Sequence, residues 1–272
     1  THQRVEFSLL SMEQIVNQAA KWYFMFGGKV SVPIVIRIII GRGWGQGPQH
    51  SQCLHSWFAH VPGLKVILPA TPKNAKGLTI AAVRDNNPVV IFEHRWLHYI
   101  TGEVPTESYE IEIGKAIVSR TGTDITIVAL SYMVLESIKA SDLMEKEGVS
   151  IEVIDLCSIR PLDTTTVLKS VKKTGRLIVA DIGALVSGIS SEIISICIEN
   201  IFSDLKCAPV RIGLPDFPTP TSPSLSKDYY PHSGHIEEAI RKMMGLNSKP
   251  NSLILPDDIE HDKPNPEFKG PF

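Results

Sequence analysis

Apolar and polar positions change their period along this chain, and these changes predict its elements. Short, nearly continuous apolar runs are typical of buried parallel strands; they lie at 32–40, 64–68, 89–92, 125–130, 151–156, 177–180 and 209–212. Elsewhere apolar residues recur every three or four positions, which predicts helices over 7–28, 71–84, 133–147, 163–173, 190–202 and 235–244. Because strands alternate with helices, we expect βαβ units and an α/β fold with mainly parallel sheets.

Residues 102–115 divide the alternating pattern into two parts. This stretch contains Gly102, Pro105 and Gly114 and lacks a helical period, so we interpret it as a linker. A chain of 272 residues is long enough for two modest domains. We therefore predict one domain over 1–101 and another over 116–246. An extended tail is predicted over 247–272, which is rich in proline and lacks periodicity.

The first predicted strand leads into a glycine-rich loop, 41–52, in which His50 follows the glycines. Alternate glycines let the backbone adopt positive φ and approach a ligand closely. Their spacing fits neither a dinucleotide-binding nor a P-loop motif. Ligands of open parallel sheets bind at the carboxyl ends of the strands, and an imidazole can transfer protons near neutral pH. His50 is therefore the candidate catalytic residue, and Ser51 is expected to cap a helix that follows it.

Composition narrows the classes of function. A formal net charge of −2 argues against a nucleic-acid-binding surface. Arg37 interrupts the longest apolar run, so no membrane span is expected. The four cysteines lack metal-ligand spacing and are expected to be reduced thiols. Cys53 lies close to His50 in sequence, but no neighbour in sequence would activate it as a nucleophile. Residues 93–99 are expected to form an exposed loop without a catalytic role.

Further motifs follow the loop in order along the chain, at 56–66, 74–78, 84–90, 92–94, 153–156, 160–163 and 173–177. Together with Gln49-His50-Ser51-Gln52 they resemble the beta subunit of thiamine-diphosphate-dependent 2-oxo-acid dehydrogenases. The resemblance runs from about Phe7 to Met243. It implies a transketolase-like pyrimidine-binding domain that lacks its N-terminal part, followed by a transketolase C-terminal domain. The implied reaction is oxidative decarboxylation of a 2-oxo acid, pyruvate foremost, with acyl transfer to lipoate.

The resemblance also implies site residues. His50 would protonate or hydrogen-bond the substrate-derived group, and Phe7 would lie against the aminopyrimidine of the cofactor. From the residues alone, Phe7 is a hydrophobic staple on the first helix. The family's cofactor-activating glutamate belongs to a region before the start of this sequence, and Glu6 is out of register with it. A structural potassium ion is implied at Ile34, Ala82, Val83, Asp85 and Asn87, whose oxygen ligands suit a hard cation, although this segment alone predicts a turn.

The resemblance further implies partners and a compartment. An alpha subunit would hold the magnesium ion and the cofactor diphosphate in an α2β2 assembly with a second copy of this chain. A lipoyl acyltransferase core would bind the assembly. The expected location is the cytoplasm, or an organelle matrix in a eukaryote.

Two alternatives stay open at this point. A transketolase or deoxyxylulose-phosphate synthase fragment would share both domains, but it would need more basic phosphate ligands than Arg42. A non-catalytic assembly subunit would keep only the partner surfaces; Cys157, where an arginine is common, and the apolar stretch 181–188 depart from the family pattern. Pyruvate, branched-chain 2-oxo acids and acetoin are all compatible with the sequence.

Overall fold

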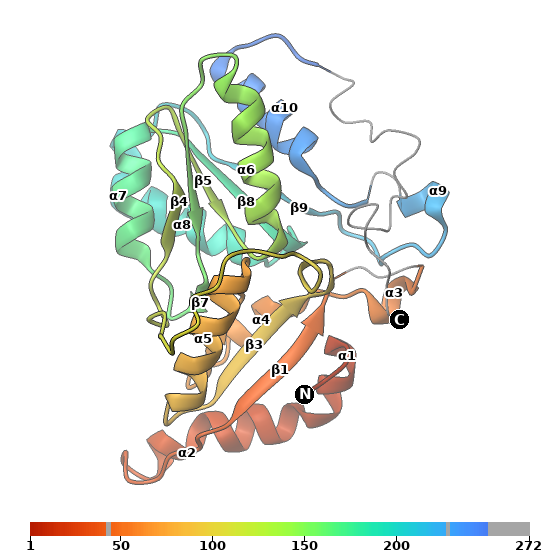
Figure 1. Cartoon of the computed structure of the whole chain (residues 1–272), viewed down its shortest axis with the longest axis vertical. Coiled ribbons are helices and arrows are strands. Elements are labelled where there is room, and N and C mark those ends of the chain that lie inside the picture. The colour runs from red at the N-terminus through yellow and green to blue at the C-terminus, as the bar shows by residue number, and fades with distance from the viewer. Residues whose placement is uncertain (42–44, 227–228, 250–272) are drawn as a thin grey trace.

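The computed structural model describes residues 1–41, 45–226 and 229–249, and it contains two sheets flanked by helices (Figure 1). The predicted α/β class is confirmed. Arg42 and the predicted tail from residue 250 onward lie outside the described residues. Within the described ranges, no helix is both long and apolar enough to span a membrane.

The first sheet has the strand order β1-β3-β2-β7. Its strands are β1 (Val35–Ile40), β2 (Lys65–Ile67), β3 (Val89–His94) and β7 (Ser158–Arg160). The first three are parallel, and the pairing of β1 with β3 ends at Ile40 opposite His94. β7 was not predicted, because it is short and lies in the second half of the chain; it pairs antiparallel with β2. The first sheet is therefore completed by the second half of the chain.

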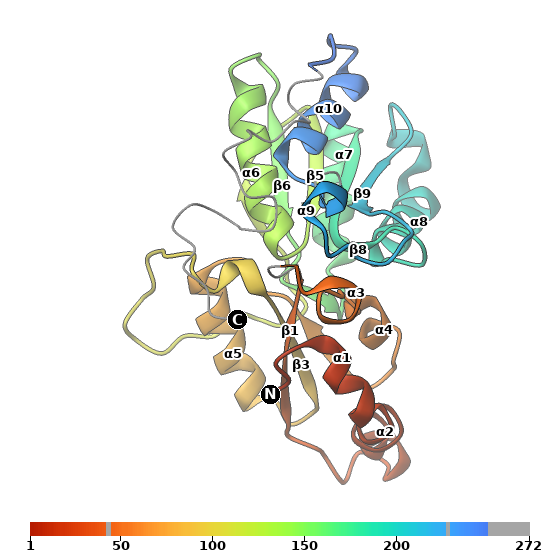
Figure 2. The ribbon, with the colours of Figure 1, turned by 90° about the vertical axis from the view of Figure 1, so that its right-hand side faces the viewer.

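Helical segments cover both faces of this sheet, with α5 on one face and the N-terminal helices and α4 on the other (Figure 2). The helical segments of this part of the chain are α1 (Val5–Ser8), η1 (Leu9–Ser11), the π-helical η2 (Glu13–Ala19), α2 (Ala20–Met25), α3 (Gly47–His50), α4 (His55–Ala59), α5 (Pro72–Arg84) and η3 (Arg95–Leu97). The N-terminal helix begins at Val5, before the predicted start at Phe7. A helix does follow Ser51, as predicted, but it begins only at His55, the first residue of α4. Ser51 follows the end of α3 and does not cap α4.

The second sheet has the strand order β4-β6-β5-β8-β9. Its strands are β4 (Ile117–Arg120), β5 (Ile125–Ala129), β6 (Ile151–Asp155), β8 (Leu177–Ala184) and β9 (Val210–Leu214). All are parallel except β4, an unpredicted edge strand that pairs antiparallel with β6. β5 and β6 are buried along their whole length, which explains their continuous apolar runs.

Helices also cover both faces of the second sheet, with α6 packed on α10 and α7 packed on α8. Their bounds are α6 (Tyr132–Glu145), α7 (Thr164–Thr174), α8 (Ile189–Ile201), η4 (Phe202–Asp204), α9 (Pro223–Ser226) and α10 (Ser233–Met244). The four longer helices agree with the predicted ones to within a few residues. Gly175 and Gly245 end α7 and α10 in the left-handed conformation that glycine favours.

The two sheets share a packed seam. Buried apolar residues from both form one continuous cluster. Polar contacts cross the seam as well. The side-chain amide of Asn74 donates to Asp155 Oδ2 at 2.9 Å, and His55 Nε2 lies 3.0 Å from Asp181 Oδ1. Residues 102–115 contain no helix or strand but are anchored on α5, where the Ile111 amide donates to the Gly77 carbonyl. The two sheets are thus held together by more than a flexible connection.

Candidate active site

The glycine-rich loop leaves the carboxyl end of β1 at Gly41. Gly41 has φ of +86°, and a Cβ there would collide with the His94 imidazole. Gly47 begins α3 with φ of +70°, where a Cβ would collide with the Thr221 hydroxyl. Glycine is required at both positions, because the backbone is left-handed and closely approached. These constraints place His50 at the end of α3, on the edge predicted for a site.

His50 forms a pair with Glu6 of α1. The imidazole Nδ1 is hydrogen-bonded to the Glu6 carboxylate oxygen Oε1. The His50 side chain is 42% exposed and that of Glu6 only 13%, so the carboxylate lies behind the imidazole. The second carboxylate oxygen of Glu6, Oε2, is buried and has no hydrogen-bond partner among the described residues. Glu6 is not among the predicted site residues, since it is out of register with the family glutamate. Nothing in its local pattern indicates that α1 packs beside α3 (Figure 2).

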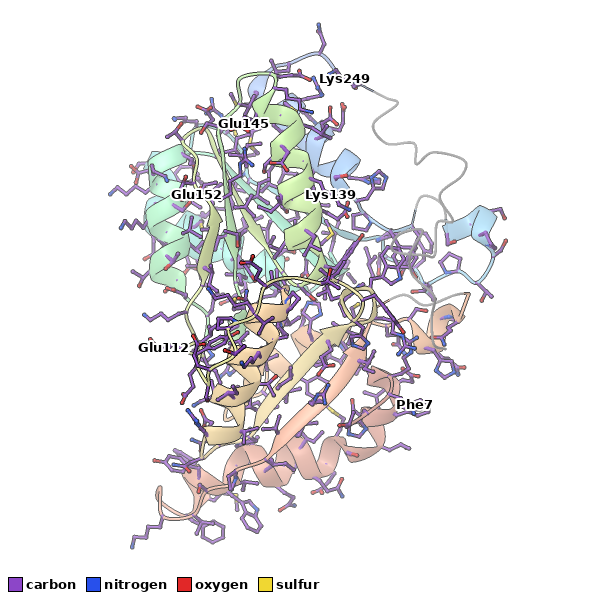
Figure 3. The ribbon with its side chains drawn as sticks, in the orientation of Figure 1. Phe7, Glu112, Lys139, Glu145, Glu152 and Lys249 are labelled. Carbon is purple, nitrogen blue, oxygen red and sulfur yellow. The ribbon has the colours of Figure 1, made fainter. Side chains whose placement is uncertain are left out.

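Phe7 joins this pair from the same turn of α1. Its ring centroid lies 5.8 Å from that of His50, with the two planes inclined by 33°. The Phe7 side chain projects outward from α1 (Figure 3), and the residue is about half-exposed. The structure thus brings the two predicted residues Phe7 and His50 together. A staple contact onto the helix would not require this exposed ring face.

Arg4 holds the N-terminal segment against the loop. Its guanidinium is buried and donates to the Gly41 carbonyl at 3.2 Å and to the Gln46 side-chain oxygen. Burial, aided by the nearby charge of Arg95, lowers the pKa of Arg4 to about 10, so the group remains charged at neutral pH. Because these bonds join α1 to the first residue and to the middle of the loop, they fix the position of Glu6 relative to His50.

Cys53 does not provide a nucleophile to this site. Burial, together with the negative charge of Asp181, raises the pKa of the thiol to about 12. A thiol with this pKa is almost wholly protonated at neutral pH and therefore a poor nucleophile. All four cysteines are free.

The segment after β3 differs from the exposed loop that we predicted. His94, Arg95 and Trp96 are buried, and the His94 ring stacks on Tyr132 with a centroid distance of 5.2 Å. Burial acts to raise the pKa of Glu93, but hydrogen bonds from His98 and Arg37 outweigh it and hold this pKa at about 2. His94, Arg95 and Trp96 are buried because β3 extends to His94 and Tyr132 of α6 packs against the His94 and Trp96 rings. His98 and Tyr99, in contrast, are exposed as predicted.

The residues of the predicted potassium site lie close together around the turn after α5. The Asp85 carboxylate accepts a hydrogen bond from the Asn87 amide at 2.9 Å, and the Ile34 carbonyl accepts from the Val89 amide. The oxygens of Asp85 and Ile34, together with the Ala82 and Val83 carbonyls, are ligands of the type that suits a hard cation. A carbonyl that already accepts one hydrogen bond still has a second lone pair for a cation. Asp85 Oδ2, however, is paired with the Lys65 ammonium, so a cation there would compete with Lys65. The site stays a prediction. Among the described residues, no group of three or more His, Cys, Asp and Glu side chains is arranged to hold a metal ion.

A large groove lies elsewhere on the surface. It has a volume of about 1350 Å³ and is lined by residues of the N-terminal helix, α4 and α8, among them Tyr23, Trp57 and Ile189. His50 and Phe7 are not among its lining residues. Phe7 and His50 are instead half-exposed on the surface of this chain. A half-exposed aromatic ring beside a half-exposed imidazole fits the face of a flat heteroaromatic ring, such as the aminopyrimidine of thiamine diphosphate.

Comparisons with known proteins identify the two domains of this chain. The family model described as "Transketolase, pyrimidine binding domain" matches residues 3–99, and "Transketolase, C-terminal domain" matches residues 114–236. A solved structure described as "Split gene transketolase, inactive beta4 tetramer" superposes with a TM-score of 0.72 at 22% identity, covering 91% of this chain and 76% of that one. At this identity the superposition shows the fold alone.

Relatives of known name are more similar. The beta subunit of acetoin:2,6-dichlorophenolindophenol oxidoreductase from Cupriavidus necator is 42% identical over 240 residues, 88% of this chain and 71% of the relative. The mitochondrial beta subunit of the pyruvate dehydrogenase E1 component from Pisum sativum is also 42% identical over 240 residues, 87% and 67% of the two chains. The corresponding Rhizobium meliloti subunit is 39% identical over 236 residues, 86% and 51%. The chain therefore spans only part of each of these relatives.

Proposed function

Since this chain belongs to the family of beta subunits of thiamine-diphosphate-dependent 2-oxo-acid dehydrogenases and acetoin oxidoreductases, we propose that it serves in the oxidative decarboxylation of a 2-oxo acid, pyruvate foremost, with acyl transfer to lipoate. The observation that carries the proposal is the His50–Glu6 pair beside the half-exposed Phe7 ring. This arrangement combines a proton-transferring group with a surface for a flat cofactor ring.

Each residue has a role in this proposal. Thiamine diphosphate, when bound, supplies the electron sink that carbon dioxide loss requires. Phe7 would hold the cofactor ring through its exposed face. His50 would hold or deliver a proton at Nε2, the nitrogen that faces away from Glu6. Arg4 keeps the loop in place, so the imidazole is held before substrate arrives.

The exposure of Phe7 and His50 supports a site that is shared between chains. An alpha subunit would cover this surface and supply the residues that bind magnesium and the cofactor diphosphate. A second copy of this chain and a lipoyl acyltransferase core are further proposed partners, and the turn at Asp85 is the proposed potassium site. The proposed compartment is the bacterial cytoplasm or an organelle matrix.

A second candidate reaction is the oxidative cleavage of acetoin. The observation that favours it is the 42% identity to the Cupriavidus necator acetoin oxidoreductase subunit, which equals the identity to the pea pyruvate dehydrogenase subunit. His50 would have the same proton-transferring role in either reaction, so the His50–Glu6 pair does not distinguish between the two substrates.

The test uses the full-length chain with its alpha subunit and thiamine diphosphate. Pyruvate, a branched-chain 2-oxo acid and acetoin are compared as substrates, with 2,6-dichlorophenolindophenol as electron acceptor. We expect the highest kcat/KM with pyruvate, and a fall in kcat of at least ~100-fold in His50→Ala, the size typical of general acid–base catalysis. The matched control is His60→Ala, because His60 is an exposed histidine at the end of α4 and should leave kcat unchanged.

Each other outcome has a defined meaning. Turnover of acetoin alone would favour the second candidate. Turnover that persists in His50→Ala would remove the proposed role of the imidazole. A stable complex with the alpha subunit that turns over none of the three substrates would refute catalysis and favour an assembly subunit.

A further inference from the structure

We infer that Glu6 is a positioning residue that fixes the tautomer and orientation of His50. This inference deepens the proposed function and depends on it for its catalytic consequence, although the position and protonation of the imidazole can be measured without activity. The pair joins side chains 44 positions apart, on α1 and α3.

The direction of the hydrogen bond follows from the chemistry of the two groups. An ionised carboxylate can only accept hydrogen bonds. Since Glu6 Oε1 faces His50 Nδ1, the neutral imidazole must carry its hydrogen on Nδ1. Nε2 is then the unprotonated nitrogen, which can accept a proton from a substrate-derived group. With the opposite tautomer, a lone pair on Nδ1 would face the carboxylate.

The surroundings hold Glu6 in this position. Arg4, two residues earlier, is bonded to the Gly41 carbonyl and to Gln46 of the loop that carries His50. Its positive charge also interacts with the Glu6 carboxylate. Phe7, the next residue, lies against the His50 ring. Hydrogen bonds from Arg4 and a ring contact from Phe7 therefore join the segment around Glu6 to the loop and to α3, so the carboxylate is held in place before a ligand binds.

The carboxylate has a second effect during the reaction. When Nε2 accepts a proton, the imidazole becomes a cation, and a carboxylate bonded to Nδ1 stabilises that cation. The side chain of Glu6 is mostly shielded from water, which strengthens the interaction. Glu6 does not itself need to touch the substrate or cofactor in this role.

The first measurement is the ¹⁵N spectrum of histidine-labelled full-length chain in complex with its alpha subunit, at a pH where His50 is neutral. His50→Gln identifies the resonance. We expect wild-type His50 to be protonated at Nδ1 and unprotonated at Nε2, and we expect Glu6→Leu to lose this preference. Glu13→Gln is the control, because Glu13 is an exposed carboxylate in the same N-terminal segment and should leave the His50 spectrum unchanged.

The second measurement is steady-state kinetics of Glu6→Gln, which keeps the size of the side chain and removes its charge. We expect kcat to fall by roughly 10- to 100-fold, less than in His50→Ala, because the imidazole remains but its cation is less stabilised. Glu6→Asp keeps the charge and should recover part of the loss. Circular dichroism confirms that each variant is folded, and Glu6→Gln also provides the spectrum if Glu6→Leu does not fold.

The inference and the proposed function fail in different ways. An Nδ1-protonated His50 in Glu6→Leu, or a wild-type imidazole protonated at Nε2, would overturn the inference whatever the activity. Wild-type kcat in Glu6→Gln together with a large loss in His50→Ala would overturn the role of Glu6 and leave that of His50 intact. Full activity in His50→Ala would instead refute the proposed function, while the spectra would still report on Glu6.

Discussion

The buried pair His55–Asp181 should contribute strongly to the stability of the seam between the two sheets. His55 Nε2 lies 3.0 Å from Asp181 Oδ1, and the two side chains are 0% and 1% exposed. Asp181 Oδ1 also accepts from the Gly183 amide, but Oδ2 has no partner among the described residues. Replacing His55 with leucine fills the position with an apolar side chain and leaves the Asp181 carboxylate without its imidazole partner. Breaking a buried pair in this way typically costs about 3–5 kcal/mol of the free energy of unfolding.

Urea unfolding of the full-length chain, followed by circular dichroism, measures this loss. The charge can be removed separately: His55→Leu combined with Asp181→Asn should recover at least half of the lost stability, because asparagine can still accept from Gly183 without burying a charge. The matched control is Asp204→Asn, since Asp204 and Lys172 form an exposed pair at 3.8 Å that should contribute less than about 1 kcal/mol. A loss below about 1 kcal/mol in His55→Leu, or no recovery in the double variant, would refute this reasoning.

Two further predictions concern acid stability and potassium. The pKa of Glu93 lies at about 2, below its ordinary value of 4.5, so its hydrogen bonds with His98 and Arg37 stabilise the fold fully above pH 4.5 and lose this effect as the pH falls toward 2. Glu93→Gln should therefore reduce the fall in the free energy of unfolding over that range, measured by urea unfolding, by about 1–2 kcal/mol after allowance for the exposure of Arg37; an unchanged pH profile would contradict this. At the turn after α5, potassium chloride should raise the melting temperature above that in lithium chloride of equal ionic strength, and Asp85→Ala should abolish the difference. Equal melting temperatures in the two salts for the unmodified chain would argue against the site.

The elements that the sequence predicted correctly are those with a strong local signal. β5 and β6 are buried on both faces and so appear as unbroken apolar runs. α5 begins after Thr71, whose hydroxyl accepts a hydrogen bond from the backbone N–H of Asn74. Pro72 occupies the first turn, so the start of this helix was predictable from residue type. α7 has the same signal in Asp163, which accepts from the Thr166 amide.

The missed elements depend on partners that are distant in sequence. β7 contains only Ser158–Arg160 and exists because β2 offers it an open edge. The segment at His94 is polar and aromatic, which suggests exposure, but Tyr132 of α6 covers it. Ser51 does not cap the helix predicted after it, because Ser51 is buried and α4 begins only at His55. A local pattern cannot report a contact with a strand or a ring that is distant in sequence.

The candidate site also contains one residue that local sequence features predict and one that they do not. His50 was identifiable because it follows a costly glycine-rich loop at the end of a strand, and those are local features. Glu6 was not, because only the packing of α1 beside α3 brings its carboxylate to Nδ1. The groups that hold the imidazole thus come from within this chain and are already in contact, whereas the Phe7 ring and the outer face of His50 remain open to solvent. In the proposed site, Glu6 holds one side of the His50 imidazole, and the other side is exposed. A second protein chain could therefore cover the exposed side and supply the remaining ligand contacts. On the proposed function, the alpha subunit would be needed for activity, but it should not be needed to form the His50–Glu6 pair.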